Sequence, residues 1–263
     1  MNAYAKINLA LVVGPMRPDG KHEVTTVLQR IALADEVTLE PAPALRVAGF
    51  EDDTLVRSAL ERVAEAAGVS SAWAVRIEKR IPVAAGLGGG SSDAATALRL
   101  ANESLDAPLS ADALHRIAAE IGADVPFFLA EGPQLGEGDG TELTPLDLPQ
   151  DYTVLVAVPA GEAKHSTAGV YAAFDERGGA VGYYERRASL IAALAAGDLG
   201  RLPRNDLAVS PLAAELRRLG ALRADVSGAG PAVYALFDEA ERAAAARAHV
   251  EPLGRVWVGP PAW

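Results

Sequence analysis

Cysteine is absent from this 263-residue sequence, and its absence removes several classes of chemistry at once. The chain can form no disulfide, zinc ribbon or iron–sulfur cluster, and it offers no thiol nucleophile. A G-x-S-x-G elbow is also missing, which disfavours a Ser-His-Asp hydrolase. The few histidines do not show the spacing that is typical of a metal site; they are His22, His115, His165 and His249.

Excess positive charge is equally lacking, because the formal net charge is −11 at pH 7. Nucleic-acid-binding domains normally carry a basic patch, so we expect no nucleic-acid partner. An anionic small molecule would have to be held by local backbone N–H groups and a few well-placed cations.

Long apolar runs are missing too. The run Ile7–Val13 is interrupted by Asn8 and is too short to span a bilayer. It follows no basic segment and precedes no obvious cleavage site, so it does not resemble a signal peptide. We expect a cytoplasmic protein without a membrane partner, and either a monomer or a weak homodimer.

Strand and helix patterns fill both halves of the chain. Apolar residues make up 50% of the sequence, which is enough for a sizeable core. Alternating or continuous apolar segments predict strands at 4–13, 24–40, 73–77, 154–158, 222–227, 232–237 and 255–258. Apolar residues at helical spacing predict helices at 54–67, 93–103, 110–122, 167–175, 186–196, 211–219 and 239–250. Three of these helices follow a suitable N-cap residue, namely Asp53, Ser110 or Ser210.

A segment with prolines divides the two halves. Residues 141–151 contain Pro145 and Pro149 and few periodic positions, so we place a domain boundary there. We predict an N-terminal domain of residues 1–148 and a C-terminal domain of residues 149–263. Both mix strands and helices, which predicts the α+β class.

The most specific local signal is a glycine-rich loop between a predicted strand and a predicted helix. From Pro82 to Ser92 the sequence is PVAAGLGGGSS. Its glycines permit positive φ and close approach of a ligand, and the N–H groups of the following helix point back at the loop. Together these features predict an anion site suited to nucleotide phosphates. The loop is neither a Walker A motif nor G-x-G-x-x-G, and the alternative is a flexible linker.

Two polar residues interrupt the first apolar run. A strand places Lys6 and Asn8 on one face, which is either a solvated face or part of a site. Asp124 stands two residues before Pro126, so it is a helix N-cap, a catalytic carboxylate, or both. If Lys6 and Asp124 meet near the loop, the carboxylate would orient a hydroxyl or accept its proton. The ammonium would then neutralise charge on a transferring phosphoryl group.

A second glycine turn, Val226–Pro231 (VSGAGP), joins two predicted strands. One alternative is an ordinary hairpin turn built from permissive residues. The other is a backbone wall of an active-site cleft.

These motifs occur in the order in which the GHMP kinase superfamily has them, and the chain resembles that superfamily. The three shared motifs are Ala5–Leu9 (AKINL), Pro82–Ser92 and Ser227–Gly230 (SGAG). The resemblance is greatest to the group that acts on a cytidine-diphosphate-linked sugar alcohol. The segments that select this group are Arg17–Glu23, Gly122–Phe127, Gly136–Gly138 and Ser166–Tyr171. Matching segments run from Ala5 to about Phe237.

The resemblance implies a fold and a reaction. The fold would be the two-domain GHMP kinase fold, with an N-terminal domain like the second domain of ribosomal protein S5 and a ferredoxin-like C-terminal domain. The reaction would move the γ-phosphoryl group of ATP, accompanied by Mg²⁺, to a hydroxyl of a small-molecule substrate in the non-mevalonate isoprenoid pathway. No protein ligand of the metal is implied.

Two alternatives to this function remain. One is another GHMP kinase of the homoserine or mevalonate type, against which Gly122–Pro126 (GADVP) and Tyr171 speak. The other is a sensor that binds nucleotide without catalysis, against which the presence of both Lys6 and Asp124 speaks.

The roles of single residues follow from the same resemblance. Lys6 and Asp124 would be the catalytic pair. The ATP-phosphate loop would comprise Pro82, Val83, Ala84, Ala85, Gly86, Leu87, Gly88, Gly89, Gly90, Ser91 and Ser92. The substrate contacts would be Asn8, His22, Thr167 and Tyr171. In that group of kinases the histidine binds the cytosine edge and the aromatic residue stacks on the ring.

One position departs from the pattern of the group. A tyrosine usually precedes the histidine and forms one wall of the cytosine slot, but this chain has Lys21 there. The lysine stem can cover a ring face and its ammonium can reach phosphate, yet it cannot stack as an aromatic ring does. Loss of one stacking wall would cost about 1–3 kcal/mol.

Overall fold

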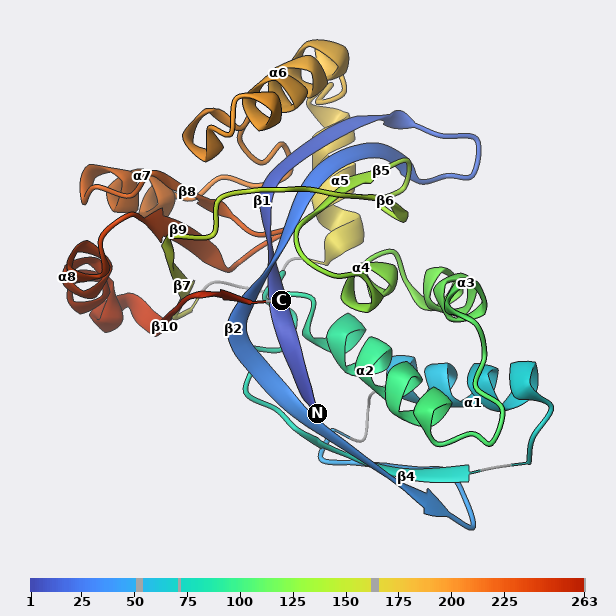
Figure 1. The fold of residues 1–263 in the computed structure, drawn as a ribbon. Coiled ribbons are helices and arrows are strands. Elements are labelled where there is room, and N and C mark those ends of the chain that lie inside the picture. The colour runs from blue at the N-terminus through green and yellow to red at the C-terminus, as the bar shows by residue number, and fades with distance from the viewer. Residues whose placement is uncertain (51–53, 71, 162–165, 263) are drawn as a thin grey trace. The chain divides into compact units, whose positions relative to one another are not determined.

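The computed structural model describes residues 1–50, 54–70, 72–161 and 166–262 (Figure 1). Every strand and helix predicted from the sequence is present, with ends that differ by a few residues. The strands are β1 (Asn2–Met16), β2 (His22–Ala42), β3 (Arg46–Ala48), β4 (Ala72–Glu78), β5 (Gln134–Glu137), β6 (Glu142–Pro145), β7 (Thr153–Pro159), β8 (Arg223–Val226), β9 (Val233–Phe237), β10 (Gly254–Gly259) and β11 (Pro261–Ala262). The helices are α1 (Thr54–Ala67), α2 (Gly89–Glu103), α3 (Ala111–Ile121), α4 (Val125–Leu129), α5 (Thr167–Glu176), α6 (Tyr183–Ala195), α7 (Pro211–Arg218) and α8 (Ala240–Val250).

The chain forms two compact units, and it passes between them several times. The first unit comprises Met1–Ala5, Leu33–Val83 and Gly88–Glu131. The second comprises Lys6–Ala32, Ala84–Leu87 and Gly132–Trp263. The strands β1 and β2 and the glycine-rich loop therefore each contribute residues to both units. The domain boundary after residue 148 stays a prediction.

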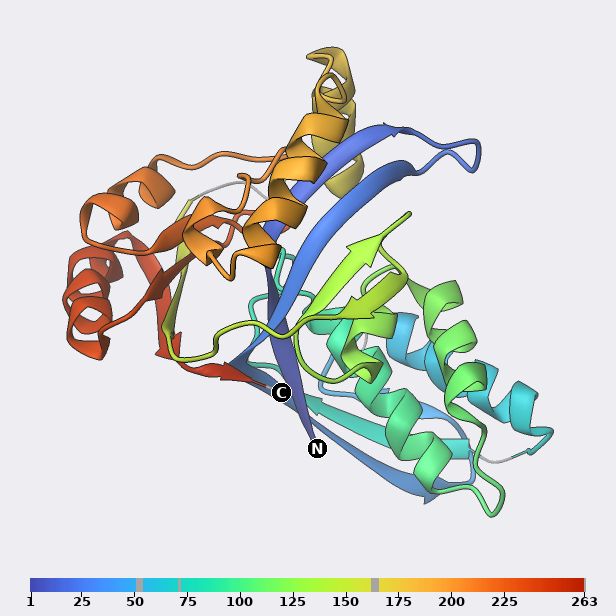
Figure 2. The same cartoon turned by 45° about the horizontal axis from the view of Figure 1, so that its top comes forward.

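In the first unit, β4 lies between β3 and the end of β2, and it contacts the helices α1 and α2. It pairs antiparallel with the end of β2 and parallel with β3. Its residues Trp73, Val75 and Ile77 alternate in sequence and are all buried, as a strand with one covered face requires. The helices α1 and α2 lie side by side (Figures 1 and 2). The apolar residues of α1 thus pack at the helical spacing that the sequence predicted.

A buried ion-pair cluster fixes both ends of the glycine-rich loop within this unit. The Lys79 Nζ atom lies 2.5 Å from Asp35 Oδ2 and 2.7 Å from Asp93 Oδ2, and both carboxylates are fully buried. Burial alone would lower the pKa of Lys79, but the two carboxylates raise it above its ordinary value. Asp35 Oδ1 also accepts hydrogen bonds from the backbone N–H groups of Arg80 and Ile81. The chain is therefore held just before the loop and again in α2.

In the second unit, a four-stranded antiparallel sheet has the order β10-β7-β9-β8. The helices α7 and α8 pack beside it (Figure 1). The shared core includes Leu155, Ala157, Leu212, Leu216, Val233, Phe237, Ala243 and Ala246. These residues are apolar at period two in the strands and at helical spacing in the helices, which explains why sheet and helices meet there.

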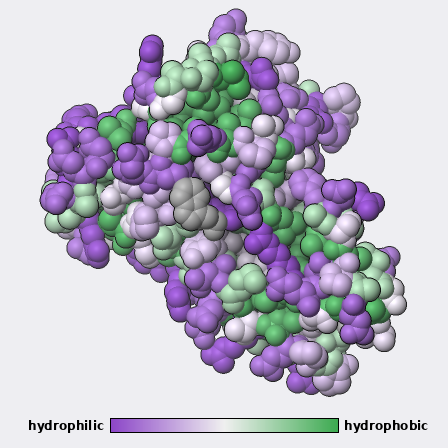
Figure 3. Space-filling view, in the orientation of Figure 1, coloured by the Kyte–Doolittle hydropathy of each residue, from purple (hydrophilic) through white to green (hydrophobic). Residues whose placement is uncertain are grey.

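The rest of the second unit is built on residues 6–16 of β1 and residues 22–32 of β2. There β2 pairs antiparallel with β5 and β11, and β5 pairs with β6. Leu11, Val13 and Val24 pack with Phe174 of α5 and with Leu207. Hydrophilic residues cover most of the surface in view, while hydrophobic residues gather beside α5 and α6 (Figure 3).

Two of the three predicted helix caps lie among the described residues, and both are confirmed. Ser110 accepts a hydrogen bond from Ala113 N at 3.3 Å, and Ser210 accepts one from Leu212 N at 3.2 Å. Asp53 lies outside the described residues. Among the helices that the structure describes, none has the length and apolar character of a membrane-spanning segment.

Some short elements were not predicted. They are the strands β3, β5, β6 and β11 and the 3₁₀ helices Leu199–Arg201 and Glu251–Leu253, whereas α4 was anticipated only by the N-cap alternative for Asp124. The strand β6 lies inside the segment in which we placed the domain boundary, and it pairs antiparallel with β5 across a short turn, with Leu135 opposite Thr144. Strands of this length depend on their pairing and packing context more than on their own composition, so apolar alternation does not reveal them.

Candidate active site

The glycine-rich loop runs directly into α2. The helix begins at Gly89, four residues before the predicted start at Asp93. Its N-cap residue, Gly88, has φ +68° and makes no side-chain cap. The first N–H groups of α2 are therefore not covered by a capping side chain, and the positive end of the helix dipole lies at the same place. This local structure suits an anion, and the role of the loop as a phosphate site stays a prediction.

Only glycine fits at Gly86. Its φ is +82°, and a Cβ atom there would lie 2.2 Å from the carbonyl oxygen of Ser227. A side chain would therefore have to displace backbone, which has little freedom to move.

The second glycine turn packs against this loop within the second unit. The Ser227 hydroxyl donates a hydrogen bond to the Gly86 carbonyl at 2.9 Å, and Ala232 N donates to the Ala85 carbonyl at 3.0 Å. The turn also joins β8 and β9, with Val226 paired to Val233. It is thus a hairpin turn and, at the same time, a backbone support for the loop.

The pair Lys6 and Asn8 lies next to the same contact. Lys6 N donates to the Leu87 carbonyl at 2.9 Å, and Asn8 N donates to Ser227 Oγ at 3.3 Å. The side chains meet as strand periodicity predicted, with Lys6 Nζ 2.7 Å from Asn8 Oδ1. Both residues are only 4% exposed, so they do not form a solvated face. Three separate sequence motifs therefore converge in one compact unit.

The predicted cytosine-binding residues form a second group in this unit. The rings of His22 and Tyr171 lie 4.8 Å apart, and Phe174 meets His22 edge-on. His22 Nε2 lies 2.8 Å from Asp175 Oδ1. Because a carboxylate only accepts, this nitrogen donates, which makes Nδ1 of the neutral ring an acceptor. Thr167 is exposed at the first position of α5, one turn before Tyr171.

Lys21 forms an ion pair at the tip of the β1–β2 hairpin. Its Nζ lies 2.5 Å from Asp139 Oδ2 in the turn between β5 and β6, and Asp139 Oδ1 accepts from the Thr141 hydroxyl at 2.6 Å. Burial alone would raise the pKa of Asp139, but the hydrogen bonds from Lys21 and Thr141 lower it to about 2. The hairpin that presents His22 is thus tied down by charge.

Asp124 belongs to the first unit, and its side chain makes no cap. It occupies the N-cap position of α4 with backbone angles of −83° and −15°, but without a side-chain capping hydrogen bond. Asp124 therefore has the N-cap position that the sequence suggested, but its side chain does not form the capping hydrogen bond. Because Lys6 belongs to the other unit, the meeting of the two residues stays a prediction.

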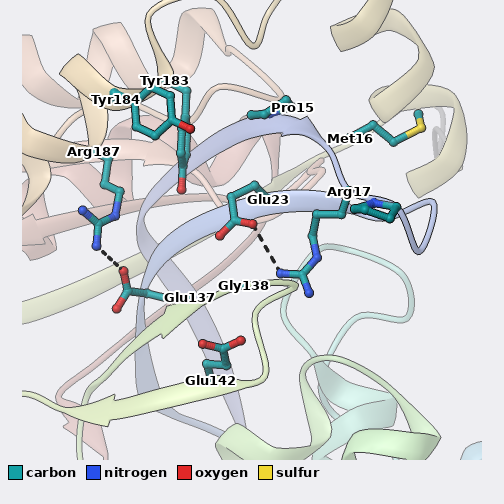
Figure 4. Close-up of a pocket in the computed structure, with 11 residues that line it drawn as sticks. Pro15, Met16, Arg17, Glu23, Glu137, Gly138, Glu142, Tyr183, Tyr184 and Arg187 are labelled. Atoms are coloured by element: carbon teal, nitrogen blue, oxygen red, sulfur yellow. Dashed lines mark hydrogen bonds and ion pairs between the residues drawn. The ribbon is translucent and has the colours of Figure 1, made fainter.

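A cavity of about 550 Å³ lies elsewhere in the second unit (Figure 4). Its lining residues are Pro15, Met16, Arg17, Pro18, Glu23, Glu137, Gly138, Glu142, Tyr183, Tyr184 and Arg187, and none is a predicted site residue. Both arginines already contact a carboxylate, since Arg17 pairs with Glu23 and Arg187 with Glu137. The cavity is therefore poorly suited to phosphate, and we do not assign the active site to it.

Sequence reasoning missed the partners of two predicted residues. Asp175 lies one helical turn after Tyr171, so its spacing in α5 could have indicated it. Asp139 lies 118 residues from Lys21, and no local pattern connects the two.

We predict that Gly86→Ala lowers kcat/KM for ATP on the order of 100-fold, because the added methyl group pushes the loop away from Ser227. Steady-state kinetics measures the effect. The matched control is Gly132→Ala, which also has positive φ but nothing within 4 Å of the added Cβ. It should lose about 1–2 kcal/mol of stability and keep its kinetics. Equal kinetics for both variants would contradict the assigned role of Gly86.

The Asp139 carboxylate should stabilise the fold in a pH-dependent way. Its pKa is lower in the folded protein, about 2 against an ordinary 3.8, so its contribution is fully present above pH 3.8 and is lost as the pH falls towards 2. Thermal unfolding of the wild type and Asp139→Asn should differ at pH 7 and converge near pH 2. A gap of unchanged size at pH 2 would show that Asp139 acts by packing and not by charge.

Comparison with known proteins agrees with this arrangement of motifs. Residues 54–132 match the GHMP kinases N terminal domain, and residues 186–253 match the GHMP kinases C terminal domain. A crystal structure of 4-(cytidine 5'-diphospho)-2C-methyl-D-erythritol kinase superposes with a TM-score of 0.82 and 31% identity, over 100% of this chain and 99% of that one. The predicted two-domain α+β fold of the GHMP kinases is confirmed.

Curated relatives agree along nearly the whole length. The 4-diphosphocytidyl-2-C-methyl-D-erythritol kinase of Nocardia farcinica is 38% identical over 97% of this chain and 90% of its own length. The protein of the same name from Symbiobacterium thermophilum is 36% identical over 98% of both. The chain therefore belongs to the GHMP kinases and, within them, to the family of the 4-diphosphocytidyl-2-C-methyl-D-erythritol kinases.

Proposed function

We propose that this chain transfers the γ-phosphoryl group of ATP to the 2-hydroxyl of 4-diphosphocytidyl-2-C-methyl-D-erythritol, a step in the non-mevalonate route to isoprenoid precursors. The observation that carries the proposal is the convergence of three motifs at Gly86: the Lys6–Asn8 strand, the glycine-rich loop and the second glycine turn. The full-length similarity to kinases of that name supports the choice of substrate.

The glycine-rich loop is the proposed phosphate site. Residues 82–88 place glycine-rich backbone directly ahead of the start of α2, which has no side-chain cap and whose N–H groups would donate to anionic oxygens. The Lys79 cluster keeps the flanks of the loop in place, so the N–H groups are oriented before ATP binds. Preoriented donors of this kind stabilise charge in the transition state.

Magnesium enters with ATP in this proposal. Among the described residues, no three His, Asp or Glu side chains gather as a metal site. Mg²⁺ commonly keeps its waters and binds substrate phosphates with only one or two carboxylates. When bound to the phosphates, it neutralises their charge, and we assign it no ligand from the protein.

The roles of Lys6 and Asp124 follow from their chemistry. We propose that Asp124 orients the acceptor hydroxyl and accepts its proton, which is the role of a carboxylate general base. The buried Lys6 would neutralise charge on the transferring group. Asn8 would position the acceptor, since its amide is already oriented by Lys6 and Thr26.

Cytosine recognition is assigned to the group around His22. Cytosine presents an exocyclic amino donor, and the Nδ1 acceptor of His22 matches it once Nε2 donates to Asp175. Tyr171 offers a ring face for the base, and Thr167 lies one helical turn before it. The Lys21–Asp139 pair replaces an aromatic wall, so we propose that charge, and not stacking, fixes this side of the slot.

The remaining aspects of the proposal concern the setting of the reaction. We propose a cytoplasmic enzyme that acts as a monomer or weak homodimer on a small molecule, without a nucleic-acid partner. The acidic net charge of −11 and the absence of a basic patch in the sequence support the last point.

The test is a kinase assay with MgATP and different acceptors. We expect the cytidyl-linked substrate to be phosphorylated with a far higher kcat/KM than free methylerythritol, homoserine or mevalonate. Preference for one of the other acceptors would overturn the substrate assignment, and nucleotide binding without turnover of any acceptor would favour a sensor.

The same assay tests the proposed carboxylate. Asp124→Asn should lower kcat on the order of 100-fold or more while ATP binding persists. The matched control is Asp112→Asn, an identical change at an exposed position of α3. Turnover of Asp124→Asn at the level of the control would remove Asp124 from its role.

A further inference from the structure

The buried side chain of Asn205 links the second glycine turn to the loop before α7. It is 5% exposed and lies in the loop before α7. Its Nδ2 donates to the carbonyl of Val226 at 3.0 Å and to that of Gly228 at 2.7 Å. Its Oδ1 accepts from the backbone of Leu207 and Ala208. Donors on one side and acceptors on the other fix the orientation of the amide.

The carbonyl that receives the shorter of these two bonds belongs to the residue in contact with the loop. Gly228 has φ +56°, and a Cβ atom on it would lie 3.4 Å from Gly86 O and 3.6 Å from Asn8 Oδ1. The neighbouring Ser227 bonds both of these residues. A shift of the Gly228 peptide would therefore move the surface on which Gly86 rests.

The residue after Asn205 ties the same segment to β1. Asp206 N donates to the Leu11 carbonyl at 2.9 Å, and Asp206 Oδ2 accepts from Val13 N at 2.8 Å and from Arg186 Nε at 2.9 Å. The strand that carries Lys6 and the turn that supports the loop are thus held by two consecutive residues.

We propose that Asn205 is a positioning residue for nucleotide binding, which acts through Gly228 and Ser227 on Gly86. The proposal rests on the assignment of the glycine-rich loop to ATP. Asn205 contacts neither nucleotide nor acceptor in this scheme. Its amide holds the second glycine turn in position, and that turn holds the backbone around Gly86 in the conformation that binds phosphate.

Asn205→Asp removes the donor and keeps the shape of the side chain. The new carboxylate faces two carbonyl oxygens, so repulsion should displace the turn and weaken affinity for a non-hydrolysable ATP analogue with Mg²⁺, on the order of tenfold or more. As the pH falls, protonation restores one donor, so affinity relative to the wild type should recover. Calorimetric titration between pH 5.5 and 9 measures both effects.

The matched control is Asn102→Asp. Asn102 is also buried, and its amide both donates to and accepts from the backbone of Leu109, at the end of α2 far from the loop. It should lose stability but keep affinity for the analogue. If both variants change affinity equally, Asn205 has only a structural role and the proposal is wrong.

A double-mutant cycle keeps the proposal testable if Asn205→Asp does not fold. Asn205→Ser and Ser227→Ala both weaken the same support of Gly86. The double variant should therefore bind the analogue about as weakly as the worse single variant. Effects that multiply would overturn the proposal. Analogue affinity needs no turnover, so this result stands apart from the acceptor assay that tests the proposed function.

Discussion

The hydrogen bond from the Ser227 hydroxyl to the Gly86 carbonyl is the contact on which the site depends. It joins residues 141 positions apart, and the backbone carbonyl of the same serine leaves no space for a side chain at Gly86. Asn8 N donates to the same hydroxyl, so the strand with Lys6 shares this contact. Because these groups are largely backbone, their geometry is set by the fold and is in place before a ligand arrives, which is the condition for strong electrostatic stabilisation.

Local patterns in the sequence predicted the long elements and the motifs well. Apolar spacing identified α1 and β4, and period two placed Lys6 and Asn8 on one face. The pattern could not show that this face is buried, because burial depends on the turn at Ser227. The hydrogen bonds of Asn205 and the Lys21–Asp139 pair escaped prediction because each joins residues distant in sequence. The short strand β6 escaped because its residues show no strand pattern of their own and are ordered by pairing with β5.

Lys21, in place of the tyrosine usual in the group, changes the physics of the proposed cytosine site. An aromatic wall binds a base by stacking, which depends little on pH or salt. An exposed ammonium held by Asp139 is sensitive to both. The neighbouring His22 keeps its orientation through Asp175 and Tyr171, as the proposed hydrogen bond to the base edge requires.

Hydrogen–deuterium exchange tests the central claim, that nucleotide phosphates bind the glycine-rich loop, most directly. On addition of a non-hydrolysable ATP analogue with Mg²⁺, amides in residues 84–92 should gain protection. Amides in 134–142, beside the cavity of Figure 4, should not change. Protection confined to the cavity lining, with residues 84–92 unaffected, would contradict the account.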